Sequence, residues 1–127
     1  MIKKLSIIVS TIVFLAVSVP LFAHHGSASY DTSKTVTVTG TVTGYIWANP
    51  HVFLKVDAKD DSGDTAHWVI EAQNPVTQTS KGWTKNTFKP GDEVIVDVTP
   101  AKNNALVGEF KEFNGGRIVI NGKQFKP

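Results

Sequence analysis

The stretch VTVTGTVTGYIWA, residues 36–48, carries the strongest structural signal in the chain. Apolar or small residues alternate along it with polar and aromatic ones, which is typical of a long strand with one face in a core. Ile46 and Ala48 are the last residues with the same parity as the valines of this stretch, so we expect both side chains to face the core. Gly40 and Gly44 interrupt the pattern and indicate a bend or a close backbone approach, as where a sheet curls into a barrel.

The rest of the chain adds shorter strands and one helix signal. Asn74-Pro75 predicts the start of a short helix, because asparagine caps a helix and proline suits its first position, and Gly82 can end it. Further strands are predicted by alternation or by apolar runs at 52–56, 66–71, 94–98, 106–113 and 117–120. Asn121-Gly122 predicts a tight hairpin turn after the last of them. Five or six strands, with one short helix after the third, predict an all-β, OB-like barrel, and a compact β-sandwich is the alternative.

The first 23 residues have the layout of a secretory signal peptide. Lys3 and Lys4 give a short positive start, an apolar run of about 15 residues follows, and Ala23 is a small residue at the expected cut. The run is shorter than the roughly 20 residues that a membrane-spanning helix needs. We therefore expect a periplasmic or secreted protein with no membrane span after signal removal. Its parts are a signal peptide (1–23), an N-terminal arm that is expected to run over the surface (24–34) and a single β-barrel domain (35–127).

Signal removal changes the charge and the chemistry of the chain. The whole chain has 13 basic and 11 acidic residues, and Lys3 and Lys4 leave with the signal, so the remaining 104 residues carry no net formal charge. A neutral domain has no general attraction for phosphate backbones, which argues against nucleic acid as a partner. The chain has no cysteine, and its one methionine is Met1. Any metal site in the mature chain must therefore use nitrogen and oxygen ligands.

Two histidines directly follow the expected cut. If the signal ends at Ala23, His24 becomes the chain end, and its α-amine and imidazole can chelate one metal ion. One more imidazole, from His25 or His51, would complete a nitrogen-rich planar set, which suits Cu(II) better than Zn(II). Two alternatives stay open. One is an unstructured tail without a metal role, and the other is a cut after the small residues at 26–28, which would remove both histidines.

The register of the hairpin between the second and third strands relates His51 to a carboxylate. With the turn centred in the aspartate-rich cluster between these strands, Glu71 faces Phe53 and lies one diagonal step from His51. The same register places His67 opposite Asp57, four residues further along, or about 13 Å at the usual rise. We therefore expect that His51 and Glu71 can share an ion, and that His67 forms an exposed cross-strand pair. The alternative for His51 is a turn residue whose ring bonds a backbone carbonyl.

Several short motifs occur in order along nearly the whole mature chain. They are Ala23-His24-His25, Trp47-x-Asn49-Pro50-His51, Trp68-x-x-Glu71, Gly82-Trp83 and Pro90-Gly91-Asp92-x-Val94. Together they resemble a bacterial family of small exported proteins of unknown function, the DUF6152-like family. Relatives in that family continue with serine after the two histidines, where this chain has Gly26. The resemblance implies a periplasmic, β-barrel-like domain, and it implies no reaction.

These patterns predict a periplasmic protein that binds a divalent transition metal, with copper favoured. The predicted ligands are His24 (amine and ring), His25 and His51, with Glu71 as an outer partner that orients a ring. One alternative is a metal-free module that docks another periplasmic protein. A second is a histidine-brace copper oxidase, which is disfavoured because the small domain leaves little surface for a substrate. No catalytic triad or carboxylate pair has a readable spacing, so catalysis would have to come from a bound metal.

Overall fold

The computed structural model describes residues 29–111 and 115–126. In chain order, the elements are β1 (Val36–Ile46), β2 (Phe53–Lys59), β3 (Thr65–Glu71), α2 (Pro75–Ser80), β4 (Glu93–Pro100), β5 (Val107–Phe110), β6 (Ile118–Ile120) and β7 (Lys123–Gln124). The predicted signal and the arm up to residue 28 lie outside the described residues. Within the described part of the chain, no helix is long and apolar enough to cross a membrane.

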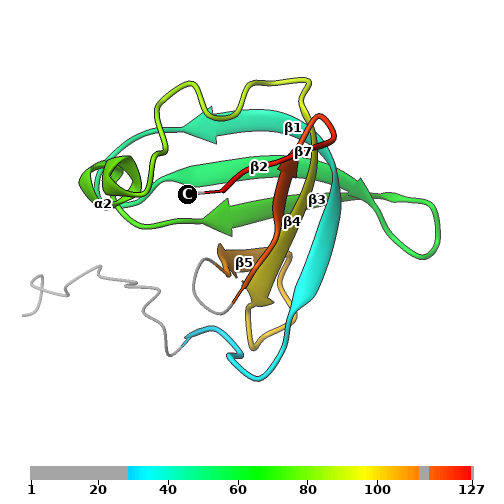
Figure 1. The fold of residues 1–127 in the computed structure, drawn as a ribbon. Helices are drawn as coiled ribbons and strands as arrows, with labels where there is room; N and C mark the ends of the chain where they lie inside the picture. The colour runs from blue at the N-terminus through cyan, green and yellow to red at the C-terminus, as the bar shows by residue number, and fades with distance from the viewer. Residues whose placement is uncertain (1–28, 112–114, 127) are drawn as a thin grey trace, which may run out of the picture.

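Five strands close into a barrel (Figure 1). β1 pairs antiparallel with β2 on one side and with β4 on the other, and β5 joins β3 to β4. The order β1-β2-β3-β5-β4, closed by the β1–β4 pairing and with a helix between β3 and β4, is that of an OB-like barrel. The predicted fold class is therefore confirmed, and a closed sheet replaces the sandwich alternative. β6 and β7 form a hairpin that extends the sheet from β4.

The interior of the barrel is filled by apolar side chains that alternate along the strands. Fully buried strand residues include Leu54, Val56, Ile70, Val96 and Val98. Trp83, in the loop after α2, is also fully buried, and its ring centroid lies 5.4, 5.1 and 5.7 Å from those of Phe88, Phe110 and Phe125. These edge-on contacts join the loop after α2, β5 and the C-terminal hairpin into one core.

β1 contains a bulge that the alternating sequence does not reveal. Its register against β2 shifts between Val42 and Gly44, so one residue of β1 has no partner. A one-residue shift sends every later side chain to the opposite face of the sheet. Tyr45 therefore packs against the core, whereas Ile46 points outward and is 42% exposed. The prediction that Ile46 and Ala48 face the core is wrong for this reason.

Close backbone approach, predicted from the two glycines of β1, is confirmed at Gly40. A Cβ atom at this position would lie 2.2 Å from the carbonyl oxygen of Asp57 on β2. Only a residue without a side chain fits there. Gly44 differs, because a Cβ atom at the bulge would make an ordinary contact, 3.4 Å from the Lys55 side chain.

Cap and turn signals in the sequence agree with the structure. Asn74 caps α2, since its side-chain oxygen accepts a hydrogen bond from the Thr77 backbone N–H at 2.9 Å. Gly82 follows the helix with a positive φ of 82°. Asn121 and Gly122, with φ of 50° and 78°, form the tight turn between β6 and β7. The predicted strand at 106–113 is shorter than expected, because only Val107–Phe110 is paired among the described residues.

Candidate functional site

The β2–β3 ladder continues past the ends of both strands and places His51 beside the end of β3. Phe53 pairs with Glu71, as the predicted register requires. Beyond this pair, the Val52 N–H donates to the Gln73 carbonyl at 3.2 Å, and the Ala72 N–H donates to the Val52 carbonyl at 2.8 Å. These bonds fix the backbone on both sides of the hairpin. His51 therefore lies next to Glu71 although it belongs to the loop before β2.

The His51 ring is held through its Nδ1 atom. This atom lies 3.1 Å from Oε1 of Glu71 and 3.2 Å from the carbonyl oxygen of Ala72. A carbonyl oxygen only accepts hydrogen bonds, so the hydrogen in this contact must be on Nδ1. In the neutral ring, Nε2 then keeps its lone pair, which is the form that binds a metal ion. The His51 side chain is 35% exposed and the Glu71 side chain only 9%, so the ring rests on a buried carboxylate and reaches solvent.

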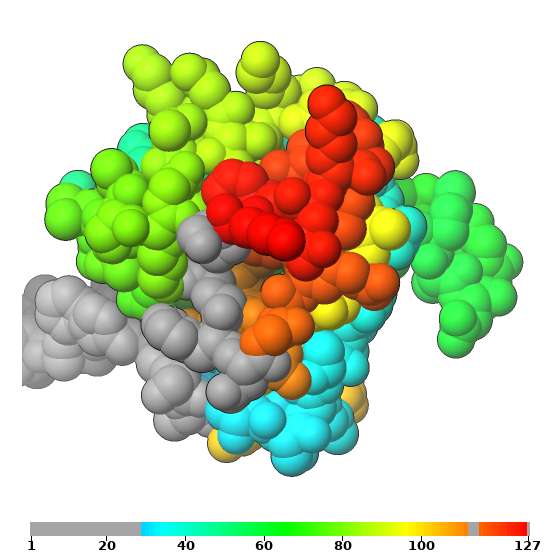
Figure 2. Space-filling view, viewed as in Figure 1, coloured from blue at the N-terminus to red at the C-terminus, as the bar shows by residue number. Residues whose placement is uncertain are grey.

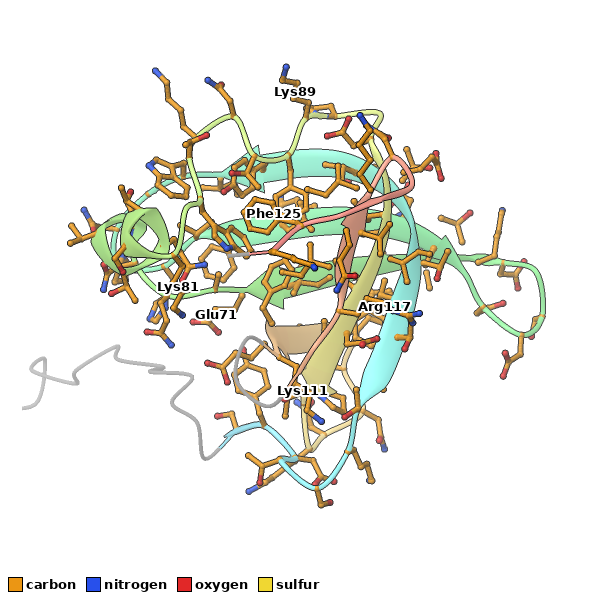
Figure 3. All side chains as sticks on the ribbon, in the orientation of Figure 1. Glu71, Lys81, Lys89, Lys111, Arg117 and Phe125 are labelled. Carbon is orange, nitrogen blue, oxygen red and sulfur yellow. The ribbon has the colours of Figure 1, made fainter. Side chains whose placement is uncertain are left out.

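Glu71 has a second partner on its other oxygen. The hydroxyl of Tyr30 donates a hydrogen bond to Oε2 of Glu71. Tyr30 is 3% exposed, and burial, together with this hydrogen bond, raises the pKa of its phenol above the ordinary value. The phenol therefore remains a protonated donor. Figure 3 shows Glu71 on the side of the barrel that also carries α2.

The backbone around Tyr30 is attached to the segment after β4. Tyr30 forms an isolated antiparallel bridge with Ala101, the Asp31 N–H donates to the Pro100 carbonyl at 2.8 Å, and the Lys102 N–H donates to the Ser29 carbonyl at 3.0 Å. An arm over the surface was expected for 24–34, and that prediction is wrong at Tyr30, which is buried. The sequence signal that could have found it is a single aromatic residue within a polar segment.

A second histidine–carboxylate pair lies elsewhere on the same hairpin. Nδ1 of His67 is 2.6 Å from Oδ1 of Asp57, and the His67 side chain is well exposed whereas that of Asp57 is partly exposed. The two residues face each other across β2 and β3, nearer to the turn than the Phe53–Glu71 pair. The turn end of this hairpin projects from the barrel on the side away from α2 (Figure 2). His67 forms the predicted cross-strand pair.

The structure thus brings together two of the four predicted metal-site residues, His51 and Glu71. His24 and His25 lie outside the described residues. Among residues 29–111 and 115–126, no group of three or more His, Cys, Asp or Glu side chains could hold a metal ion. The pair is therefore incomplete as a metal site without ligands from another part of the chain, and the four-residue set stays a prediction.

Fold and site together define a small OB-like barrel protein with a histidine–carboxylate pair on the outside of its β2–β3 hairpin. A family model described as "Family of unknown function (DUF6152)" matches residues 12–110, and the chain belongs to this family. Among crystal structures, the mitochondrial single-stranded DNA binding protein Rim1 from S. cerevisiae is similar, with a TM-score of 0.46 and 14% sequence identity. The match covers 70% of this chain and 96% of Rim1. No curated protein matches the chain.

Proposed function

We propose that this protein binds a divalent transition metal outside the cytoplasm, with copper favoured. The barrel supplies one ligand, Nε2 of His51. The observation that carries the proposal is the position of Nδ1 of His51 between the Glu71 carboxylate and the Ala72 carbonyl. A histidine that binds a metal through one ring nitrogen almost always donates its other ring N–H to a carboxylate or a carbonyl, which fixes the tautomer and the ring orientation.

The remaining ligands in this proposal come from the N-terminal arm. His25 and His24 precede Tyr30 by five and six residues. An extended chain spans about 3.3–3.6 Å per residue, so these histidines can reach about 17–22 Å from Tyr30. The Tyr30 hydroxyl already contacts the carboxylate on which His51 rests. Both histidines are therefore within reach of Nε2 of His51.

The donor set favours copper among the divalent metals. A chain that starts at His24 offers its α-amine and its ring to one ion, and His25 and His51 add further imidazoles. Such nitrogen-rich planar sets suit Cu(II), whereas Zn(II) prefers a tetrahedron. No thiolate or thioether is available after signal removal, since the chain has no cysteine and its one methionine is Met1. This absence disfavours sites specialised for Cu(I).

A competition titration of Cu(II) against a coloured chelator tests the proposal. The protein used should begin at His24, and the variants are His51→Ala and His67→Ala. His67 is the matched control, because it also faces a carboxylate on the same hairpin but lies nearer to its turn. We expect His51→Ala to weaken copper binding at least about tenfold, because even the loss of an outer partner of a ligand costs about 10- to 100-fold. We expect His67→Ala to leave copper binding unchanged. Equal affinities in all three proteins would show that His51 is not a ligand and would contradict the proposed barrel ligand. No measurable copper binding by the natural chain would favour the metal-free interaction module.

The proposal also requires a particular chain end. Intact-mass analysis of the exported protein should give a chain that begins at His24. A chain that begins at Ser29, after the alternative cut, has lost both histidines and contradicts the proposal. An oxidase, the second alternative, would consume oxygen in the presence of copper, a reductant and a substrate, whereas a protein that only stores or delivers copper would not.

A further inference from the structure

We infer that Tyr30 is a positioning residue of this site: its hydroxyl holds the Glu71 carboxylate in the orientation that fixes the His51 ring. The role of Tyr30 in metal binding rests on the proposed function. The effect of Tyr30 on the orientation of the His51 ring does not, because it concerns the metal-free protein. Tyr30 does not touch the metal in this scheme and acts only through Glu71.

The two oxygens of Glu71 have separate side-chain partners. Oε2 accepts from the Tyr30 hydroxyl, and Oε1 lies 3.1 Å from Nδ1 of His51. A buried carboxylate is stable only when hydrogen bonds replace its lost water. Without the phenol hydroxyl, Oε2 would lose this partner, and the carboxylate would gain by turning toward other donors or toward solvent. The acceptor that faces Nδ1 of His51 would then no longer be fixed.

The position of the Tyr30 hydroxyl is itself fixed by the backbone. Hydrogen bonds on both sides of Tyr30, from Asp31 to Pro100 and from Lys102 to Ser29, hold this segment along the end of β4. The ring is buried, so a phenylalanine would keep its packing and lose only the hydroxyl. Tyr30→Phe therefore removes one hydrogen bond and leaves the attachment of the arm intact.

Heteronuclear NMR of the histidine ring nitrogens in the metal-free protein tests the structural part directly. We expect His51 in the natural chain to show a protonated Nδ1 and an unprotonated Nε2, and Tyr30→Phe to mix the two tautomers. Tyr45→Phe is the matched control, because its hydroxyl bonds instead to the Thr84 carbonyl, at 3.1 Å. An unchanged His51 signature in Tyr30→Phe overturns the inference. A Glu71→Gln variant provides a further comparison. If it changes the His51 signature and Tyr30→Phe does not, then Glu71 alone orients the ring.

Copper affinity separates this inference from the proposed function. Loss of an outer partner of a metal ligand typically lowers affinity about 10- to 100-fold, and we expect a loss in this range for Tyr30→Phe and none for Tyr45→Phe. If the natural protein binds no copper, the proposed function fails, and the NMR comparison still decides whether Tyr30 orients His51. If copper binds and Tyr30→Phe binds it as tightly as the natural chain, the positioning role is contradicted.

Discussion

Nδ1 of His51 lies 3.1 Å from Oε1 of Glu71, across the open end of the β2–β3 hairpin. The regular pairing of β2 with β3 does not by itself position these two side chains, because His51 precedes β2 and Glu71 is the last residue of β3. The contact depends on backbone bonds of Val52 that continue the ladder past both strands. The contact holds Nδ1 of a half-buried loop histidine and leaves Nε2 available for a ligand.

Alkaline titration reports the environment of both tyrosines of the chain, Tyr30 and Tyr45. Burial raises the pKa of each phenol above its ordinary value, and the bond to Glu71 adds to the effect at Tyr30. The folded state therefore favours the neutral phenols. Their contribution to stability is complete below about pH 10, where an unfolded tyrosine ionises, and is lost as the pH rises further. We expect the phenolate absorbance to appear only well above pH 10, together with unfolding. The same protein in denaturant should titrate near pH 10, and a folded protein that titrates there contradicts the described burial.

A glycine pair in β1 tests the close approach of β1 and β2. Gly40→Ala should destabilise the protein by about 3 kcal/mol or more, because the new methyl group would overlap the Asp57 carbonyl and the strands would have to separate. Gly44→Ala is the control on the same strand, where the new contact is ordinary. Its cost should stay within about 1 kcal/mol. The free energy of unfolding in urea measures both, and equal costs would show that the strands are not packed as described.

Trp83 should be among the most costly core positions. Its ring is fully buried and contacts Phe88, Phe110 and Phe125 edge-on, so Trp83→Ala leaves a large cavity and should cost about 3–5 kcal/mol. Val76 on α2 is 79% exposed, and Val76→Ala should change the free energy of unfolding by less than about 0.5 kcal/mol. Urea unfolding followed by circular dichroism distinguishes them. A small loss at Trp83 would mean that the loop after α2 does not belong to the core.

Copper affinity should depend on the state of the chain end. The free α-amine of His24 must lose its proton before it binds a metal, and its ordinary pKa is near 8, so affinity should fall as the pH drops below that value. Acetylation of the amine, or one additional residue ahead of His24, should weaken binding at neutral and alkaline pH, and the difference from the free chain should shrink in acid. Chelator competition over a pH series measures both effects. Identical binding by the blocked and the free chain would exclude the amine as a ligand.

Much of the fold follows from local patterns. The structure agrees with several local signals. They are the alternation of apolar residues in β2, β3 and β4, the cap at Asn74 and the turn at Asn121-Gly122. The His51–Glu71 contact could also be predicted, because the position of one turn fixes the register of a hairpin and hence its diagonal neighbours.

Two features required information from distant parts of the chain. The bulge between Val42 and Gly44 shifts the register in the middle of a regular alternation, and the pattern of β1 alone gives no reason for it. The bond between Tyr30 and Glu71 joins residues 41 positions apart. It depends on how the first described segment lies against the end of β4, which no local pattern specifies.

Pulsed electron paramagnetic resonance of the Cu(II)-loaded chain that begins at His24 tests the metal site most directly. A bound imidazole gives a characteristic modulation from the ring nitrogen that is not coordinated. We expect His51→Ala to remove the contribution of one imidazole and His67→Ala to leave the spectrum unchanged. A spectrum from His51→Ala that is identical to that of the natural chain would show that the barrel provides no ligand, which contradicts the proposed metal site.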